Sequence, residues 1–268
     1  MPLVVCATPI GNLDDVTLRV LRELAEADLV LCEDTRHTRR LLQRHEIRVA
    51  RLLSYHEHNE AKRTAEVLPR LQAGERVALV SDAGLPAIND PGRRLIAAAR
   101  EAAVPVTVLP GPSAVETALV ASGLVSDRYQ FLGYLPRGER ALQGLGEELA
   151  RWPWSVVAFE SPQRLPRALS VLARVVPERP AAVCRELTKR FEEVVVGTLA
   201  ELASRFSDAP KGEVTIVVGP AQVTVANEGA AAEAVAELVA AGIPRRAAAD
   251  LVSRITGVAR NRLYRSSL

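Results

Sequence analysis

Four turns rich in glycine, proline and short polar side chains are the segments of this sequence best suited to chemistry. Each follows a short apolar run, and they cover residues 8–12 (TPIGN), 33–37 (EDTRH), 81–92 (SDAGLPAINDPG) and 110–114 (PGPSA). Glycine and proline let the backbone approach a ligand closely or adopt special turns. Ligands of α/β sheets bind beyond the carboxyl ends of the strands. Four such turns after consecutive strands therefore predict one pocket along a sheet edge.

Two further polar segments close apolar runs, at residues 55–60 (YHEHNE) and 185–190 (RELTKR). His56 is suited to act as a general base or a phosphate contact, because imidazole titrates near neutral pH. The plainer alternative is that both segments are capping or salt-bridged loops. His56 and His58 have no third ligand nearby, which argues against a metal site.

Several common ligand motifs are absent from the sequence. No G-x-G-x-x-G follows an expected strand and no G-x-x-x-x-G-K-[ST] occurs, which disfavours dinucleotides and P-loop nucleotides. There is no HExxH motif and no Cys/His ligand spacing, so we expect no catalytic metal. Cys6, Cys32 and Cys184 lie in apolar runs, and their odd number and wide spacing indicate free thiols in a reducing compartment.

The composition, 48% hydrophobic and 25% charged, is that of a soluble globular protein. No basic residue precedes Arg19, so a signal-peptide n-region is not expected. No uncharged apolar stretch reaches the roughly 18 residues of a membrane span. These features predict a cytoplasmic protein without a membrane partner.

The net charge is only +2, but arginine is concentrated in two segments, residues 36–51 and 245–265. Each holds six arginines against a single acid, Glu46 or Asp250. The planar guanidinium suits phosphate, although a genome bias towards arginine would produce the same count. The alternatives are functional basic patches and solvated faces.

Apolar runs alternate with helical periodicity and predict an α/β fold with a largely parallel first sheet. A second block has two strands joined by a short link, which indicates a mixed sheet. The last segment is helical in pattern. We expect an N-terminal α/β domain over residues 1–112, a second α/β domain over 113–222, and a small C-terminal helical segment over 223–268.

Taken together, the motifs resemble those of the bacterial 16S rRNA (cytidine-2′-O)-methyltransferases, a family of the tetrapyrrole methylase superfamily. The resemblance runs from residue 3 to the end, and EDTRHT with SDAG…NDPG is its most specific part. The motifs, in chain order, are ATPIGNLDDVTLR (7–19), EDTRHTRRLL (33–42), HEHNE (56–60), LVSDAGLPAINDPG (79–92), LPGPSA (109–114), FLGYLPR (131–137), FESPQRL (159–165), RELTK (185–189), KGE (211–213) and GVARNRLYR (257–265).

The resemblance implies two α/β domains with a cleft that holds S-adenosyl-L-methionine, and a homodimer. It also implies 16S rRNA, or the assembled small ribosomal subunit, as the partner, and 2′-O-methylation of a cytidine as the reaction. Leu85 departs from the family pattern, which has a small hydroxylated residue there. The implied cofactor-binding residues are Pro9, Ile10, Asp82, Leu85, Ser113, Ala114, Phe159, Glu160, Gly212 and Glu213.

A ribose hydroxyl is weakly acidic, so a positioned base would help its methylation. Position after strands and beside basic residues selects four catalytic candidates: Asp34, His56, Glu186 and Lys189. The expected RNA-binding residues are Arg36, Arg39, Arg40, Arg185, Arg245, Arg246, Arg260 and Arg262.

Two other functions remain open at this point. A tetrapyrrole C-methyltransferase shares the fold and also needs arginines, because its substrate is a polycarboxylate. A non-catalytic RNA-binding or ribosome-assembly protein would account for the basic segments without any cofactor. EDTRHT, HEHNE and the basic helical tail favour the RNA methyltransferase over the first alternative.

Overall fold

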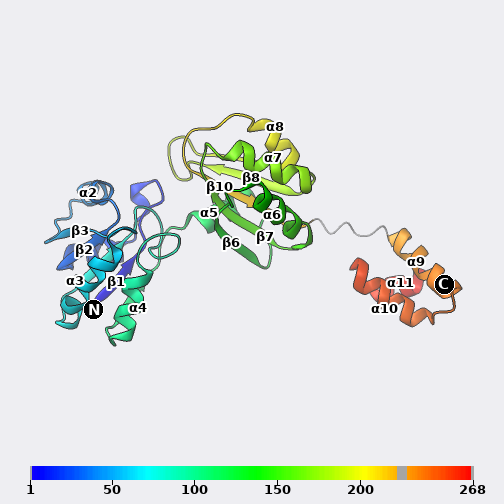
Figure 1. The fold of residues 1–268 in the computed structure, drawn as a ribbon, viewed down its shortest axis with the longest axis horizontal. Coiled ribbons are helices and arrows are strands. Elements are labelled where there is room, and N and C mark those ends of the chain that lie inside the picture. Colours follow the sequence, from blue (N-terminus) through cyan, green and yellow to red (C-terminus); the bar gives the residue numbers. More distant parts are fainter. Residues whose placement is uncertain (1, 222–227, 267–268) are drawn as a thin grey trace.

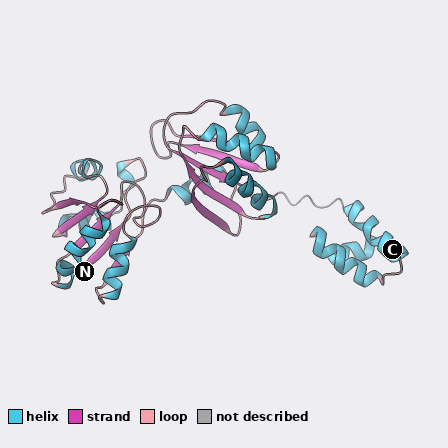
Figure 2. Ribbon diagram, viewed as in Figure 1, coloured by secondary structure: helices cyan, strands magenta, loops and turns pink. Residues whose placement is uncertain are grey.

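The computed structural model describes residues 2–221 and 228–266, which form two α/β units followed by a helical segment (Figure 1). The expected fold class is therefore confirmed. Strands gather in two separate sheets, each flanked by helices (Figure 2). The expected boundary between residues 222 and 223 lies outside the described residues.

The first sheet consists of five parallel strands in the order β3-β2-β4-β1-β5. Its strands are β1 (Leu3–Cys6), β2 (Leu29–Cys32), β3 (Leu52–Ser54), β4 (Val77–Val80) and β5 (Val106–Leu109). β1, β2 and β4 are buried along their whole length. Continuous apolar runs are what a parallel sheet covered on both faces requires.

Helices cover both faces of this sheet. They are α1 (Leu18–Glu26), α2 (Thr35–Arg44), α3 (Glu60–Gln72) and α4 (Arg93–Glu101). Side chains alternate between the faces of a strand, so Leu3 and Val5 share a core with α3 and α4, whereas Val4 and Cys6 share one with α1 and α2. Because all five strands are parallel, their carboxyl ends lie at the same edge of the sheet.

The second sheet has the order β6-β7-β10-β8-β9 and is mixed, as expected. Its strands are β6 (Tyr129–Tyr134), β7 (Ser155–Glu160), β8 (Pro180–Arg185), β9 (Glu193–Thr198) and β10 (Val214–Val218). β6 and β7 are parallel, and the other neighbours are antiparallel. β10 therefore starts at the edge where β7 and β8 end.

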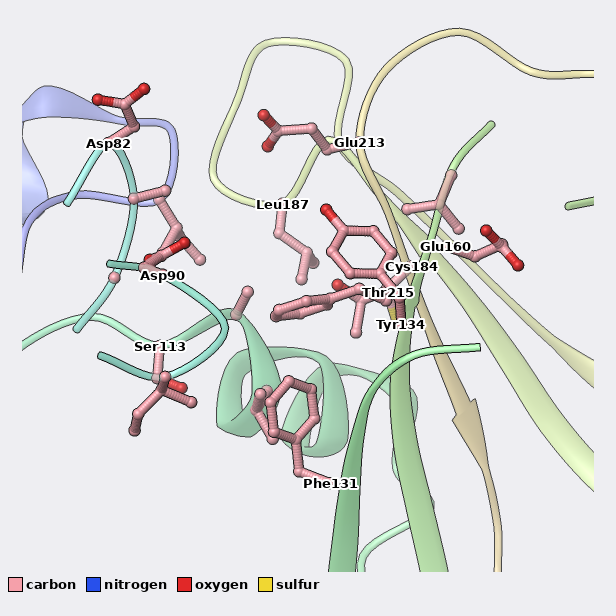
Figure 3. A pocket seen from close by; sticks show the side chains of 18 of the residues that line it. Asp82, Asp90, Ser113, Phe131, Tyr134, Glu160, Cys184, Leu187, Glu213 and Thr215 are labelled. Atoms are coloured by element: carbon pink, nitrogen blue, oxygen red, sulfur yellow. The ribbon is translucent and has the colours of Figure 1, made fainter. Parts of the chain in front are cut away.

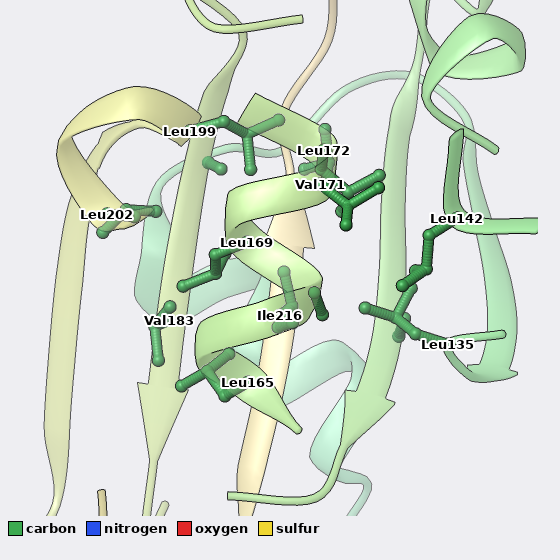
Figure 4. Close-up of a cluster of buried hydrophobic side chains, with 14 of the residues drawn as sticks. Leu135, Leu142, Leu165, Leu169, Val171, Leu172, Val183, Leu199, Leu202 and Ile216 are labelled. Atoms are coloured by element: carbon green, nitrogen blue, oxygen red, sulfur yellow. The ribbon is translucent and has the colours of Figure 1, made fainter. Parts of the chain in front are cut away.

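Four helices complete this unit: α5 (Ala114–Ser122), α6 (Glu139–Arg151), α7 (Leu165–Val175) and α8 (Leu199–Arg205). α6, α7 and α8 bury one face of the sheet, where Leu169 of α7 packs among leucine and valine side chains (Figure 4). α5 covers the other face through Ala118 and Leu119, and Ile10 from the first unit joins that core.

Two local features were not predicted from the sequence. Residues 36–44, read only as a basic segment, belong to α2, which buries Thr38, Leu41 and Leu42. α1 is capped by the Thr17 side chain, which accepts a hydrogen bond from the Val20 N–H. Asp14 and Asp15, which precede α1 in the sequence, lie in a 3-10 turn (Leu13–Asp15).

The C-terminal segment contains α9 (Glu228–Ala240), α10 (Arg245–Thr256) and α11 (Arg260–Ser266). These helices share a small core of their own that includes Val235, Ala249, Val252 and Leu263. The core holds the three helices together and leaves most arginines of this segment exposed.

Candidate active site

A cavity of about 590 Å³ lies between the two sheets, and we call it the inter-sheet cavity. The first unit contributes Asp82 and Asp90, the link between β5 and α5 contributes Ser113, and the second unit contributes Phe131, Tyr134 and Glu213 (Figure 3). Asp82, Asp90, Ser113 and Glu213 lie in turns outside the strands, whereas Phe131 and Tyr134 belong to β6. Three of the four predicted turns, residues 8–12, 81–92 and 110–114, contribute to the cavity. The fourth, residues 33–37, does not line it, so the prediction that all four turns share one pocket was wrong at this turn.

Hydrogen bonds fix the turns that follow β1 and β4 against each other. The Thr8 N–H donates to the Gly84 carbonyl at 2.8 Å, and the Gly84 N–H donates to the Thr8 carbonyl at 3.0 Å. The buried Thr8 hydroxyl donates to the Ser81 carbonyl at 3.0 Å. Gly84 has φ +75°, which favours glycine. These bonds set the positions of Ile10 and Asp82 at the cavity.

Carboxylates gather on the wall formed by the first unit. Asp82 and Asp90 line the cavity, and Glu33 lies behind them. Burial, together with the nearby charge of Glu33, raises the pKa of Asp90 to about 6. Burial and the charge of Asp82 raise the pKa of Glu33. None of the described residues lining the cavity is lysine or arginine, so the cavity favours a cationic ligand.

The second unit supplies an aromatic wall. The Phe131 and Phe159 rings stand edge to face with centroids 4.9 Å apart, and Tyr134 packs on Phe159 at 5.8 Å. Such a wall offers apolar surface to a flat ring. Opposite it, Ile10, Leu85 and Ile88 extend the apolar lining.

The turn before β10 reaches the cavity because of the antiparallel pairing described above. The Glu213 N–H donates to Glu186 Oε1 at 2.9 Å, and Lys189 Nζ bridges Glu186 and Glu213 at 2.9 Å each. The bond from the Glu213 N–H is the first cause that lowers the pKa of Glu186. Gly212 has φ +93°, and a Cβ there would lie 2.4 Å from Glu186 Cγ. This packing holds Gly212 and Glu213 at the cavity.

The two units also touch directly beside the cavity. The Asn12 N–H donates to Thr188 Oγ1 at 2.9 Å, and a Cβ on Gly11 would lie 2.6 Å from Lys189 Cγ. A Cβ on Gly133 would lie 2.9 Å from the Asn89 amide. Glycine thus permits both close approaches.

Nine of the ten residues expected to bind the cofactor line the inter-sheet cavity. Pro9 is buried next to Ile10 and is not among the lining residues. Leu85 lines the cavity and packs against the core of the first sheet. Its aliphatic side chain offers no hydroxyl to a ligand.

None of the four catalytic candidates lines the cavity. Asp34 caps α2, and its hydrogen bonds with Arg36 hold its pKa at about 2. The Asp34 N–H donates to Asp82 at 3.0 Å. Glu186 and Lys189 hydrogen-bond to Glu213, which lines the cavity. Asp34, Glu186 and Lys189 therefore sit one residue behind the lining.

His56 is held by Asn59, whose Nδ2 lies 3.0 Å from His56 Nε2. Its Nδ1 is buried and has no hydrogen-bond partner among the described residues. The charge of His56 opposes the rise in the pKa of Glu33, which places the imidazole near the carboxylate group behind the cavity.

The expected RNA-binding arginines fall in three places. Arg36, Arg39 and Arg40 lie exposed on α2, with Arg36 paired to Asp34 at 2.7 Å. Arg185 is half-buried and bound to Glu193 at 3.1 Å and to the Lys211 carbonyl at 2.8 Å. The other four lie in the C-terminal segment, where Arg260 pairs with Asp250 at 3.2 Å.

Several residues that line the cavity were not predicted from the sequence. Asp90 lies in the NDPG turn after β4, and this position was sufficient reason to predict it as a site residue. Phe131, Tyr134 and Thr215 lie in the second sheet, and only the strand pairing brings them to the cavity.

No helix within residues 2–221 and 228–266 combines the length and apolar character that a bilayer crossing needs. Across the same residues, no three or more His, Cys, Asp or Glu side chains are grouped to hold a metal ion.

Comparison with known proteins identifies the class. The model of a family described as Tetrapyrrole (Corrin/Porphyrin) Methylases matches residues 2–203. The chain has the fold of the methyltransferase CobJ, with a TM-score of 0.62 at 21% identity, covering 82% of this chain and 94% of that one. It also has the fold of uroporphyrin-III C-methyl transferase from Thermus thermophilus, complexed with S-adenyl homocysteine, with a TM-score of 0.57 at 18% identity, covering 81% and 96%. The chain belongs to the tetrapyrrole methylase family, and its cofactor is S-adenosyl-L-methionine, as expected.

Sequence relatives narrow the resemblance within this family. A protein of Mesorhizobium japonicum named ribosomal RNA small subunit methyltransferase I is 45% identical, covering 99% of this chain and 91% of the relative. One of the same name from Synechocystis sp. is 41% identical, covering 99% and 97%. The expected resemblance is confirmed over nearly the whole chain.

Proposed function

We propose that this protein transfers a methyl group from S-adenosylmethionine to the ribose 2′-hydroxyl of a cytidine in 16S rRNA, within the naked RNA or the small ribosomal subunit. We further propose that it acts in the cytoplasm as a homodimer. The observation that carries the proposal is an acidic and aromatic cavity between two sheets, in a chain with near-full-length identity to proteins named ribosomal RNA small subunit methyltransferase I.

The residues of the inter-sheet cavity fit this cofactor. S-adenosylmethionine carries a sulfonium, an ammonium and one carboxylate, hence a net positive charge. Asp82, Asp90 and Glu213 offer it negative charge, and Phe131 and Phe159 offer apolar surface to its adenine. Ser113 makes no side-chain cap on α5, so backbone N–H groups at that helix start are open to the carboxylate. Pro9 would act through Ile10, whose position it fixes.

When bound, the cofactor supplies an electrophilic methyl carbon for an in-line displacement. The chain must hold the ribose oxygen in line with that carbon, and orientation of this kind contributes about 7–11 kcal/mol. The interlocked turns around Thr8 and Gly84 provide the rigid support. The aromatic wall excludes water from the reacting atoms.

We assign the proton-accepting role to Asp90, because it is a carboxylate that lines the cavity and its pKa of about 6 leaves it ionised at neutral pH. Asp34 then acts as a positioning residue through Asp82. Glu186 and Lys189 act as positioning residues through Glu213. His56 opposes the negative charge of Glu33 beside this group. Alanine at Asp34, Glu186 or Lys189 is expected to reduce cofactor affinity as well as turnover.

The decisive experiment maps ribose methylation in small-subunit RNA from cells that lack the protein. Loss of one 2′-O-methylcytidine, restored by the purified enzyme with S-adenosylmethionine, is the expected result. Incubation with uroporphyrinogen tests the alternative substrate suggested by the fold. Methylation of that compound, with no change in the RNA, would overturn the proposal.

Deletion of residues 229–268 is expected to weaken RNA capture and to leave S-adenosylmethionine binding intact, because the segment has its own core. Loss of four phosphate contacts, from Arg245, Arg246, Arg260 and Arg262, lowers the slope of log K against log salt by about 3. Filter binding at several salt concentrations measures the slope, and calorimetry measures the cofactor. An unchanged slope would remove this segment from RNA binding.

A further inference from the structure

A second cavity, of about 550 Å³, adjoins the inter-sheet cavity. The two share Tyr134, Glu160 and Ser161 as a common wall. Arg137, Arg164 and Arg167 line the second cavity, which we call the arginine pocket. It therefore has the opposite charge character to the cavity beside it.

The topology of the second sheet creates this pocket. β6 and β7 are parallel neighbours, with Tyr134 paired to Phe159, so both strands end at the same edge. Each strand is followed by a helix, α6 or α7, and both helices begin at that edge. The positive ends of two helix dipoles consequently meet there. Arg164 and Arg167 stand at the first turn of α7, and Arg137 stands just before α6.

The three arginines differ in how many hydrogen bonds and ion pairs their guanidinium groups already make. Arg164 donates to Glu160 at 2.9 Å and to the Leu135 carbonyl at 2.7 Å, so it is part of the wall. Arg167 is 64% exposed and shares Glu139 with Arg174. Arg137 is exposed and makes no hydrogen bond or ion pair among the described residues.

The charge balance favours an anion. Arg137, Arg164, Arg167 and Arg174 carry four positive charges, whereas Glu139 and Glu160 carry two negative ones. Glu160 is 3% exposed and pairs with Arg164, so its charge is already balanced within the wall that the two cavities share. Arg137 is left to bind a ligand, and Arg167, which shares Glu139 with Arg174, adds positive charge beside it.

We infer that the arginine pocket binds a backbone phosphodiester of the RNA substrate, next to the nucleotide whose ribose enters the inter-sheet cavity. The inference rests on the proposed function and adds a substrate site to it. The shared wall places a phosphate in one cavity while the adjoining ribose faces the methyl donor in the other. A guanidinium group can donate two parallel hydrogen bonds to the oxygens of one phosphate, and the Arg137 guanidinium is free to do so.

The test compares Arg137→Gln with Arg151→Gln. Arg151 is an exposed arginine at the opposite end of α6 and serves as the matched control. We expect R137Q to lower kcat/KM for RNA about tenfold through KM, and to reduce the salt slope of RNA binding by about 0.7–0.9, the value of one phosphate. R151Q should match the wild type in both measurements. R137K, which retains charge without the fork, should fall between.

The affinity for S-adenosylmethionine, measured by calorimetry, separates the remaining outcomes. An affinity within twofold of the wild type supports the inference, whereas a tenfold loss in R137Q would mean that the pocket serves the cofactor and would overturn it. Equal RNA kinetics in R137Q and R151Q would overturn it while leaving the proposed function intact. A wild-type enzyme that binds the cofactor but methylates no RNA would refute the proposed function itself.

Discussion

Replacement of Asp90 by asparagine is expected to lower kcat for RNA methylation by about 100-fold or more, the lower range for loss of a general base. Asparagine keeps the size of the side chain but cannot accept a proton. Single-turnover assays with saturating cofactor would measure the loss. Asp90→Glu, which restores a carboxylate, should recover part of the rate.

The pH dependence provides the control for this assignment. The pKa of Asp90 is raised from 3.8 to about 6, so the carboxyl is protonated and inactive below that pH. The profile of kcat/KM for the wild type should rise through about pH 6, and the profile of D90N should lack that rise. If D90N retains turnover and loses only cofactor affinity, Asp90 binds the cofactor and another group is the base.

The stability of the folded protein should fall as the pH rises through this range, whereas the activity should rise. A raised pKa means that the folded state disfavours the carboxylate, so the wild type loses stability as the pH rises from about 4 to about 6. D90N removes that loss, and its melting temperature should exceed that of the wild type at pH 8 and equal it at pH 4. Activity and stability would then trade against each other at this position.

The elements best predicted from the sequence were those whose burial dictates their composition. β1, β2 and β4 are covered on both faces and are apolar throughout, so each stands out in the sequence as a continuous apolar run. α2 was missed because seven of its ten residues are polar and exposed or half-buried. Only Thr38, Leu41 and Leu42 face its core. The Asp34 cap was the signal that could have revealed its start.

The first wall of the site was predictable for a topological reason. In an all-parallel sheet every strand ends at the same edge, so the turns after the strands were expected on one side of the sheet. Strand order then decides that the turns after the neighbouring strands β4, β1 and β5 line the cavity, whereas those after β2 and β3 do not. The second sheet is mixed, and there the pairing decides which ends meet. The residues around Gly212 precede β10, and reached the expected list through the family resemblance alone. Phe131 and Tyr134 lie in the FLGYLPR motif of the same resemblance, but they were not selected as site residues.

The arginine pocket escaped prediction for the same reason. Arg137 and Arg164 are 27 positions apart in a chain with 34 basic residues, and nothing in their spacing distinguishes them from solvated surface. Only the parallel pairing of β6 with β7 brings them to one edge. By contrast, the arginine-rich segments selected by count include Arg36 and Arg260, which are paired to acids.

Substitution of Gly212 by alanine is expected to weaken S-adenosylmethionine binding at least about tenfold. The new Cβ would lie 2.4 Å from Glu186 Cγ, so the turn that carries Glu213 must move away from the inter-sheet cavity. Gly74→Ala is the matched control, because Gly74 has φ +91° and nothing within 4 Å. Both variants carry the strain of alanine at positive φ, about 1–2 kcal/mol, but only G212A meets a neighbour. Calorimetric titration of G74A should give the wild-type affinity.

A double-mutant cycle with Glu186→Ala tests the cause of the G212A effect. The three atoms nearest to the added Cβ are Cγ, Cδ and Oε1 of Glu186, all of which Glu186→Ala removes, so the two substitutions should be non-additive. Strictly additive losses would show that Gly212 acts independently of Glu186 and would refute the positioning role given to that carboxylate.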